Sequence, residues 1–345
     1  MHVLIVDDSN VSRLLLRALL EADGFRVSEA DNGQAALDKL TLLQPDLISM
    51  DLNMPDMDGF EATRRIMQRH PTPIAIVTAS ANLPGTQIAM RALEAGALMV
   101  LDKPNSPVDP NFQLRANKLT ETLRRLGTTP VHLPEPVATH CINGANLSTW
   151  QKRSLKVIAI GASAGGPQAL KLLLPQLNAG CPWPVLLVQH ITPGFSGSYC
   201  EWLANQTHLP VHLAEAGQIV LPGHLYVAPD NHHLLLDNQL RVVLSHDTHH
   251  SCSQPSIDVL FESLANNLGG DLVAVLLSGM GRDGAEGLAR LKTLGALTLV
   301  QKPASAVVDG IPQAAIERGA ACFVQTPGEI GETILRLRPD TQQAS

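Results

Sequence analysis

Short apolar runs alternate with helix-length segments along much of the chain, and this alternation limits the possible folds more than any other feature. Strands separated by helices pair in parallel, so the pattern predicts parallel sheets with helices on both faces. In the N-terminal part five runs have the length of strands, and we expect a five-stranded (βα)5 domain there. These runs are His2–Val6, Phe25–Ala30, Leu47–Asp51, Ile74–Ala79 and Leu98–Asp102.

The alternation stops over residues 126–154 and then resumes. Prolines cluster in this stretch, which is typical of a linker, and a length of 345 residues agrees with two domains. The later pattern predicts a doubly wound, mostly parallel α/β domain that also contains a β-hairpin. We therefore expect domains at residues 1–125 and 155–338, a linker at 126–154 and a polar tail at 339–345. The strand runs of the second domain are Lys156–Ile160, Val185–Val188, Leu272–Leu277, Ala296–Val300 and Ala321–Val324, and those of the hairpin are Leu234–Leu236 and Leu240–Leu244.

The charge and composition of the chain argue against several classes of protein. There are 25 Lys and Arg residues against 32 Asp and Glu residues, a formal net charge of −7, and no basic patch or helix-turn-helix that would support a transcription factor or nucleic-acid binding. Five scattered cysteines without a C-x-x-C pair disfavour a disulfide scaffold and a zinc ribbon. No apolar run reaches the roughly 18 residues of a membrane span, and no signal-like segment is present, so we expect a cytoplasmic protein without membrane insertion.

Polar residues follow several of the N-terminal strand runs. Asp7 and Asp8 end the first run, and Asp51 ends the third. Because the carboxyl ends of parallel strands meet at one edge of a sheet, we expect the three carboxylates to share a pocket. Like charges this close favour a hard cation such as Mg²⁺ as their partner. Thr78 and Lys103 end the fourth and fifth runs and can donate hydrogen bonds to phosphoryl oxygens.

This half of the chain resembles bacterial response-regulator receiver domains. The resemblance covers about residues 1–125 and rests on V-D-D at 6–8, M-D-L-N-M-P at 50–55, T-A-S at 78–80 and K-P at 103–104. It implies that Asp51 is the phosphoacceptor for the phosphohistidine of a histidine kinase, and that phosphorylation shifts the population of two surface arrangements.

The same resemblance implies a Mg²⁺ site and contacts to the phosphoryl group. One position departs from the pattern, because Val100 stands where many receivers carry an aromatic residue, and an aromatic rotamer switch is not expected here. The residues implied in this site are Asp8, Asp51 and the Asn53 carbonyl as metal ligands, Asp7 supporting them from behind, and Thr78 and Lys103 on the phosphoryl group.

A serine lies at a sharp strand-to-helix turn in the second half. G-A-S-A-G-G-P at 161–167 follows a strand run, and its small residues allow a tight turn. Such a turn exposes the Ser163 hydroxyl near a helix N-terminus, where backbone N–H groups stabilise negative charge. From this segment alone, a glycine-rich loop that cradles phosphate stays an alternative.

A nucleophilic serine needs a base and a group that orients the base. His190 follows the run at 185–188, and Asp283 follows the run at 272–277, so both are candidates. The order Ser, His, Asp along the chain differs from the Ser, Asp, His order of α/β-hydrolases, which disfavours an ordinary lipase or esterase. For Asp283, capping of a helix that begins at Gly284-Ala285 is a structural role compatible with orienting a histidine.

The second half is similar to the catalytic domain of chemotaxis protein-glutamate methylesterases, a family that joins a receiver to the esterase through a linker. The resemblance spans about residues 155–338 and rests on I-G-A-S-A-G-G-P, V-Q-H, P-S-I-D-V-L-F at 255–261 and L-S-G-M-G-R-D-G-A at 277–285. It implies Ser163 as nucleophile, His190 as general base and acid, Asp283 as the group that fixes the imidazole tautomer, and the Met280 backbone N–H near the oxyanion.

Together the two resemblances imply a phosphorylation-activated hydrolase that removes methyl esters from glutamates of methyl-accepting chemoreceptors, releases methanol and supports sensory adaptation. They also imply deamidation of receptor glutamines, and we expect no organic cofactor for the esterase. Two positions depart from the family, because Ala164 stands where many members carry threonine and Lys302 where members often carry an acid. A receptor-docking response regulator with little catalysis and a general small-ester hydrolase stay as alternatives.

Two further groups of residues have local explanations. His246, His249 and His250 have spacing that could serve a metal, and His232-His233 lie across the proposed hairpin. No cysteine or carboxylate completes a set, so we expect a solvated loop beside the substrate groove. Asp56 and Asp58 lie in the P-D-M-D-G segment, where turn chemistry explains both.

Overall fold

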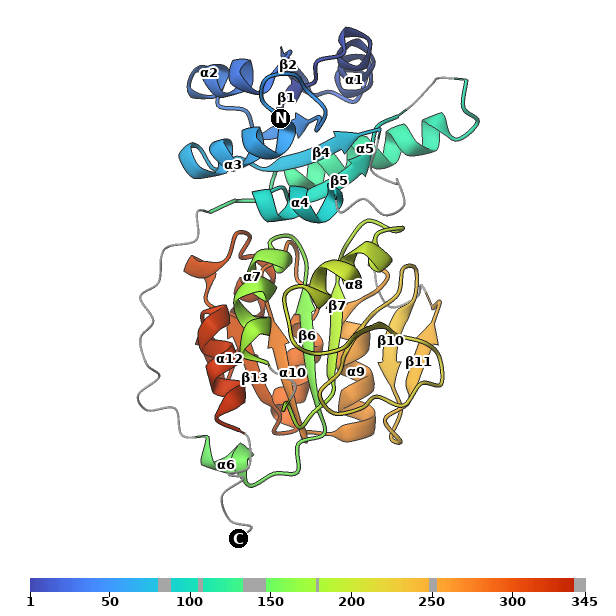
Figure 1. Cartoon of the computed structure of the whole chain (residues 1–345), viewed down its shortest axis with the longest axis vertical. Coiled ribbons are helices and arrows are strands. Elements are labelled where there is room, and N and C mark those ends of the chain that lie inside the picture. Colours follow the sequence, from blue (N-terminus) through green and yellow to red (C-terminus); the bar gives the residue numbers. More distant parts are fainter. Residues whose placement is uncertain (80–87, 105–107, 133–146, 178–179, 248–252, 338–345) are drawn as a thin grey trace. The chain divides into compact units, whose positions relative to one another are not determined.

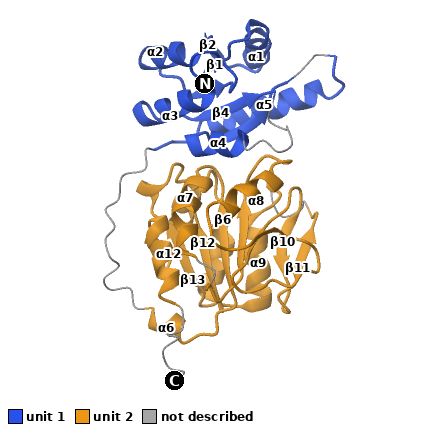
Figure 2. Cartoon of the chain, in the orientation of Figure 1, with its two compact units in different colours: residues 1–133 blue, residues 134–345 orange. Residues whose placement is uncertain are grey.

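The chain folds into two compact units, Met1–Leu133 and Pro134–Ser345, which are described separately (Figure 2). The structure is a computed structural model, and it describes residues 1–79, 88–104, 108–132, 147–177, 180–247 and 253–337 (Figure 1). The expected linker lies partly outside these residues and the expected tail at 339–345 lies wholly outside them. The three boundaries between the four predicted segments therefore stay predictions.

The first unit contains the predicted five-stranded parallel sheet, with strand order β2-β1-β3-β4-β5. Its strands are apolar and buried on both faces near the centre, where β1 and β3 are wholly buried. Helix α1 packs against α5, and α2, α3 and α4 pack in a row. The elements are β1 (His2–Val6), α1 (Asn10–Ala22), β2 (Arg26–Ala30), α2 (Gly33–Leu43), β3 (Leu47–Met50), α3 (Gly59–Arg69), β4 (Ile74–Thr78), α4 (Ile88–Ala95), β5 (Met99–Asp102) and α5 (Phe112–Leu126).

The chain order of the first sheet reverses between β1 and β3. β2 lies on one side of β1, whereas β3, β4 and β5 follow in order on the other. At such a switch point the connecting loops leave in opposite directions, and the crevice between them is where open α/β sheets bind ligands. The residues that follow β1 and β3 therefore share the binding edge of this unit.

The second unit is built on a seven-stranded sheet of order β14-β13-β12-β6-β7-β9-β8, in which every pair is parallel. The hairpin is a separate antiparallel pair, β10 with β11. The predicted doubly wound fold with a hairpin is thus confirmed. The elements are α6 (Ser148–Gln151), β6 (Val157–Ala162), α7 (Gly166–Leu173), the 3₁₀ turn Leu174–Gln176, β7 (Val185–Gln189), α8 (Ser196–Ala204), β8 (Val211–Leu213), β9 (Leu225–Val227), β10 (His233–Leu236), β11 (Val242–Ser245), α9 (Ile257–Leu268), β12 (Leu272–Leu276), α10 (Ala285–Thr293), β13 (Leu297–Gln301), the 3₁₀ turn Pro303–Ser305, α11 (Gly310–Glu317), β14 (Phe323–Gln325) and α12 (Pro327–Leu335).

Helices cover both faces of this sheet. Val157 and Ala159 of β6 belong to a buried cluster with the apolar side chains of α9, α10 and the hairpin strand β10. The alternate residues of β6, Ile158 and Ile160, are also wholly buried but lie outside that cluster, as expected for the opposite face of a strand. Helices α7 and α12 pack together there (Figure 1). The central strand β6 is therefore enclosed on both sides, which fixes the loop that leaves its carboxyl end.

Two details of the second unit differ from the sequence expectations. Strands β8 and β9, of three residues each, extend the parallel sheet and were not predicted. Strand β11 begins at Val242 rather than Leu240, because Leu240 has a φ of 60° and lies in the turn. That turn is held by the Asp237 carboxylate, which accepts from the backbone N–H groups of Gln239 and Arg241, both at 2.8 Å.

Candidate functional site

The first candidate site lies where β1 and β3 end. Ligand oxygens of Asp7, Asp8 and Asp51 all lie within 4.8 Å of one another. Asp7 and Asp51 are 1% and 7% exposed, whereas Asp8 is exposed. Asp51 is placed by its backbone N–H, which donates to the carbonyl of Val6 at 2.8 Å. The structure therefore brings together the three carboxylates that the strand ends predicted.

Lys103 supplies the positive charge of this cluster. Its Nζ lies 2.7 Å from Asp7 Oδ2 and 3.3 Å from Asp51 Oδ2, and its side chain is only 12% exposed. The backbone N–H of Lys103 donates to the carbonyl of Thr78 at 3.0 Å, so the ends of β4 and β5 are held side by side. Thr78 is wholly buried at the end of β4.

The Asp51 carboxyl is in an environment that disfavours its charge. Burial raises the pKa of Asp51 above its usual value, and the negative charge of Asp7 raises it further, although Lys103 acts in the opposite direction. Its Oδ1 atom is buried and finds no hydrogen-bond partner among the described residues. A buried carboxylate oxygen without a partner, beside two further carboxylates, fits a hard divalent cation such as Mg²⁺.

Turn chemistry explains the two acids that follow. Asp56 has a φ of 64°, a left-handed conformation that Asp tolerates, and Asp58 caps α3 by accepting from the Glu61 N–H at 2.8 Å. A Cβ on Gly59 would lie 2.1 Å from the Asp51 carbonyl oxygen. Only glycine lets the loop close this tightly behind Asp51. Asn53, the expected carbonyl ligand, is exposed in the same loop.

The second candidate site lies where β12, β6 and β7 end. Ser163 occupies the turn between β6 and α7 and is 8% exposed. Its backbone N–H donates to the Ser278 carbonyl at 3.0 Å, and its carbonyl accepts from Gln189 Nε2 at 2.8 Å. Gly165 has a φ of +77°, and a Cβ there would lie 2.3 Å from Ser278 Oγ. The turn thus depends on close backbone approach at both neighbouring strand ends.

His190 and Asp283 form a direct pair beside this turn. The His190 backbone N–H donates to the Ala162 carbonyl at 3.0 Å, which holds the end of β7 against the end of β6. His190 Nε2 lies 2.9 Å from Asp283 Oδ2, and because an ionised carboxylate only accepts, Nε2 carries the hydrogen. The other ring nitrogen, Nδ1, is then the one that can accept a proton.

Asp283 is the most heavily hydrogen-bonded acid of the site. Its carboxylate accepts from Ser256 Oγ at 2.8 Å, from the Ile257 N–H at 2.8 Å and from the Asp258 N–H at 3.0 Å, in addition to His190. Burial alone would raise the pKa of Asp283, but the His190 contact and these donors outweigh it and lower the pKa to about 2. Asp283 is therefore ionised at neutral pH.

The helix that Asp283 caps is not the expected one. The sequence suggested the helix that begins at Gly284-Ala285, yet α10 has no side-chain cap, and its preceding residue Gly284 has a φ of 90°. Asp283 instead accepts from the first turn of α9. Asp283 therefore caps a helix that comes earlier in the sequence than the helix that directly follows it.

Met280, the expected oxyanion donor, lies on the loop that faces Ser163. The position of a Cβ on the preceding residue, Gly279, would be only 2.7 Å from Ser163 Cβ. This approach places the start of the 279–284 loop against the serine, and Met280 is half-buried. Ala164 is 7% exposed in the turn itself, and Lys302 is exposed directly after β13.

Several supporting residues were not identified as site residues from the sequence. Ser278 is wholly buried, and its Oγ lies 2.8 Å from the Ala164 carbonyl and 2.9 Å from the Val308 carbonyl. Its backbone N–H donates to Gln301 Oε1 at 2.7 Å. Ser256 and Gln189 fall within the quoted motifs, so their place beside a catalytic candidate was the signal that could have identified them.

The histidine-rich segment contains no metal cluster within the described residues. His246 is exposed, with its ring centroid 3.8 Å from that of His232, while His249 and His250 lie outside those residues. Among all described residues, the acidic trio of the first unit is the only group of three or more potential ligands that converges.

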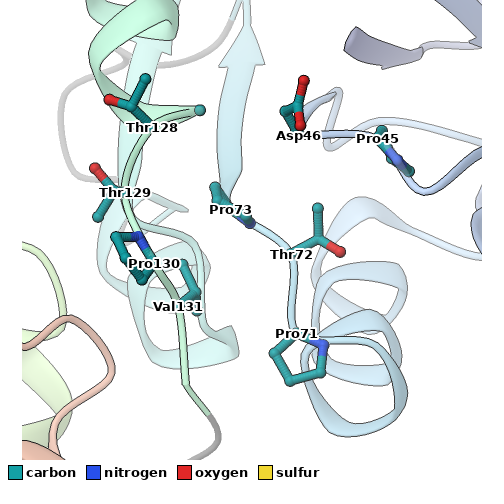
Figure 3. A pocket seen from close by; sticks show the side chains of 10 residues that line it. Pro45, Asp46, Pro71, Thr72, Pro73, Thr128, Thr129, Pro130 and Val131 are labelled. Atoms are coloured by element: carbon teal, nitrogen blue, oxygen red, sulfur yellow. The ribbon is translucent and has the colours of Figure 1, made fainter. Parts of the chain in front are cut away.

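A hollow at the amino-terminal edge of the first sheet is separate from the acidic cluster. Its lining includes Asp46, Pro73 and Pro130 (Figure 3). Asp46 and Pro73 precede β3 and β4, whereas the carboxylates follow β1 and β3. This hollow therefore takes no part in the candidate site.

Among the described residues, no helix combines the length and the apolar character that crossing a membrane requires.

Comparisons with known proteins identify both halves of the chain. Residues 158–334 match the family model described as CheB methylesterase, and residues 3–109 match the model of the response regulator receiver domain. A relative from Hahella chejuensis, named protein-glutamate methylesterase/protein-glutamine glutaminase 3, is 45% identical over 98% of both chains. A relative of the same description from Methanospirillum hungatei is 39% identical over 97% of this chain and 98% of its own. The crystal structure of the Thermotoga maritima CheB methylesterase catalytic domain, 33% identical, covers 54% of this chain and 100% of that one with a TM-score of 0.52.

Replacing Asp51 with asparagine is expected to stabilise the first unit at pH 7. A raised native pKa means that the folded state favours the protonated acid, so the ionised Asp51 lowers stability above that pKa. The gain should shrink as the pH falls through the native pKa of Asp51. The gain in stability is measured by thermal unfolding of the full chain, followed by circular dichroism. Tryptophan fluorescence reports the second unit alone, because Trp150, Trp183 and Trp202 all lie there, and so separates the two transitions.

Asp58→Asn is the matched control, because it also removes one carboxylate but keeps an acceptor for the α3 cap. It should give no gain in stability. A less stable Asp51→Asn variant at pH 7 would mean that the attraction of Lys103 outweighs the burial of Asp51, and the prediction would be wrong.

Gly165→Ala is expected to lower the free energy of unfolding of the second unit by about 1–3 kcal/mol. The added Cβ meets Ser278 Oγ, and the positive φ is strained for alanine. Gly197→Ala in α8 is the control, because nothing lies within 4 Å of its Cβ and alanine favours helix. Chemical unfolding followed by tryptophan fluorescence compares them, and equal stability of the two variants would contradict the prediction.

Proposed function

The chain belongs to the CheB methylesterase family and carries a response regulator receiver domain, and we propose that it hydrolyses glutamate methyl esters on methyl-accepting chemoreceptors. The products are glutamate and methanol, and the activity supports sensory adaptation. We extend the proposal to deamidation of receptor glutamines, because the relatives carry both activities in their names. Phosphorylation of the receiver activates the hydrolase.

The observation that carries the assignment of the active site is the His190–Asp283 pair beside the Ser163 turn. The three residues come from the ends of three adjacent strands, β7, β12 and β6, in the centre of one sheet. Nucleophilic catalysis by serine requires a base and a group that orients the base, and His190 and Asp283 supply these two.

In the proposed reaction Ser163 Oγ attacks the ester carbonyl while His190 Nδ1 takes the hydroxyl proton. The ionised Asp283 stabilises the resulting imidazolium, and its pKa of about 2 keeps the proton on the histidine. The Met280 backbone N–H donates to the developing oxyanion. The tetrahedral intermediate collapses, and His190 returns the proton to the departing methoxide, which leaves as methanol.

Water then attacks the acyl-enzyme, and His190 takes its proton. Collapse of the second intermediate breaks the bond to Ser163 Oγ, which recovers its proton from His190, and glutamate is released. A glutamine side chain follows the same course with ammonia as the leaving group. No step requires an organic cofactor, and every proton that leaves a nucleophile returns through one imidazole.

The receiver supplies the control in this proposal. A chemosensory histidine kinase donates its phosphoryl group to Asp51, and Lys103 and Thr78 bind the phosphoryl oxygens. Asp8, Asp51 and the Asn53 carbonyl would hold Mg²⁺, with Asp7 behind them; the ion supplies charge neutralisation at the phosphoryl group. Lys103 already bridges Asp7 and Asp51, so it is placed to exchange a carboxylate for a phosphoryl oxygen. The proposed location, next to the kinase and the receptor signalling domains, is the cytoplasm.

Ser163→Ala is expected to reduce methanol release from methyl-labelled receptor membranes to the uncatalysed background, because no other hydroxyl occupies the turn. Ser12→Ala in α1 is the control and should release methanol at the wild-type rate. A soluble model ester, assayed in parallel, separates receptor-specific hydrolysis from general esterase activity. Unchanged release by Ser163→Ala would remove this serine from the mechanism, and no release by the wild type would favour a receptor-docking module.

Asp51→Asn is expected to abolish the increase in methanol release that a small phosphodonor and Mg²⁺ produce in the wild type. Basal release should persist, because Ser163 and its partners are unchanged. Asp58→Asn, which keeps the α3 cap, should respond to the phosphodonor as the wild type does. Stimulation that survives in Asp51→Asn would place the phosphoacceptor elsewhere.

A further inference from the structure

A buried histidine outside the expected active site contacts the helix turn that holds Asp283. His233 of β10 is 1% exposed, and its Nδ1 accepts from the Ser256 backbone N–H at 3.1 Å. Its Nε2 lies 2.8 Å from the carbonyl oxygen of Asp247. Because a carbonyl oxygen only accepts, Nε2 carries the hydrogen, and Nδ1 is left as an acceptor. Both ring nitrogens are therefore used, and the ring has one orientation.

The contact completes the first turn of α9. A helix begins with backbone N–H groups that have no partner inside the helix. Here the Ser256 N–H has His233, the Ile257 and Asp258 N–H groups have Asp283, and the Val259 N–H has Ser256 Oγ at 3.4 Å. The first three N–H groups of the helix thus donate to two residues outside it, the first to His233 and the next two to Asp283.

A continuous path of contacts leads from the hairpin to the proposed base. His233 holds the Ser256 N–H, Ser256 Oγ donates to Asp283 Oδ1 at 2.8 Å, and Asp283 Oδ2 accepts from His190 Nε2 at 2.9 Å. Along this path Ser256 is wholly buried and Asp283 is 15% exposed, so water does not readily replace a lost partner.

The hairpin is attached to α9 independently of His233. The Leu236 N–H donates to Ser263 Oγ at 3.3 Å, and Asn267 Nδ2 donates to the Leu236 carbonyl at 2.8 Å. Both contacts lie further along the helix than its first turn. The hairpin can therefore stay in place without the His233 contact, while the first turn loses its support.

We infer that His233 is a positioning residue for the proposed hydrolysis: it holds the first turn of α9, and that turn holds the Asp283 carboxylate against the His190 ring. The inference rests on the proposed roles of Ser163, His190 and Asp283. A displaced Asp283 orients the base less well and slows the chemical step. Substrate binding does not depend on this path, so the effect falls on kcat rather than on KM.

Two substitutions in the full chain separate the two contacts of His233. His233→Asn keeps an acceptor close to the position of Nδ1, and His233→Gln keeps a donor close to the position of Nε2. The assay is methanol release from methyl-labelled receptor membranes over a range of receptor concentrations. His233→Gln should lower kcat about tenfold or more with KM within about twofold, since a buried N–H loses its partner. His233→Asn should keep most of the wild-type kcat.

Stability is measured alongside, because a merely structural role would make kcat follow stability. Thr298→Val is the matched control: it removes a buried hydroxyl that donates to the Ala320 carbonyl at 2.7 Å, near the opposite end of the sheet. It should lower the unfolding midpoint and leave kcat unchanged at a temperature where the protein is folded. Equal kcat values for the Asn and Gln variants, or a larger loss in Asn, would overturn the inference.

Asp283→Asn distinguishes this failure from a failure of the proposed function. If Asp283→Asn lowers kcat strongly while the two His233 variants behave alike, only the role of His233 is wrong. If Asp283→Asn leaves kcat unchanged, the assignment of the active site itself is wrong.

Discussion

Parallel strand pairing is the constraint on which both sites depend. In the five-stranded and the seven-stranded sheet every strand points the same way, so the residues that follow neighbouring strands meet at one edge. Asp7 and Asp51 meet because β1 pairs with β3, and Ser163, His190 and Asp283 meet because β6 lies between β7 and β12. The apolar, buried strands determine where the polar residues go, although they contribute no chemistry themselves.

The two aspartates at the centre of these sites illustrate opposite uses of burial. Asp51 is buried with an oxygen that finds no hydrogen-bond partner among the described residues, and its pKa is raised. Asp283 is also largely buried, but four donors surround it and its pKa is lowered. The first carboxylate gains from new partners such as a cation or a proton, whereas the second is fully satisfied and stays charged. The same type of side chain thus serves two purposes: Asp51 is suited to gain a partner, and Asp283 is suited to keep its charge.

Sequence patterns predicted the elements whose residues repeat and missed those that rely on single contacts. The apolar runs located β1, β6 and β12 because both faces of those strands are buried. Strands β8 and β9, of three residues each, were not predicted. The prediction that Asp283 caps the helix after Gly284 was wrong. The helix that it does cap, α9, is distant in sequence, and nothing local distinguishes the two helices. His233 was considered only as a possible metal ligand in a solvated loop, whereas it is buried. Its role was missed because its partner, the Ser256 N–H, is distant in sequence.

Two site residues, Asp7 and Ser163, lie just before a helix, and this placement has an electrostatic consequence. Helix α1 begins three residues after Asp7, and α7 begins three residues after Ser163. The amino ends of helices carry partial positive charge, summed from aligned peptide dipoles and strongest within the first turn. The phosphoryl group proposed for the first unit and the tetrahedral oxyanion proposed for the second are unrelated species, yet both are anions and both would form at a sheet edge from which such a helix starts. Each unit therefore brings a positive potential to its proposed reaction before any side chain contributes a charge.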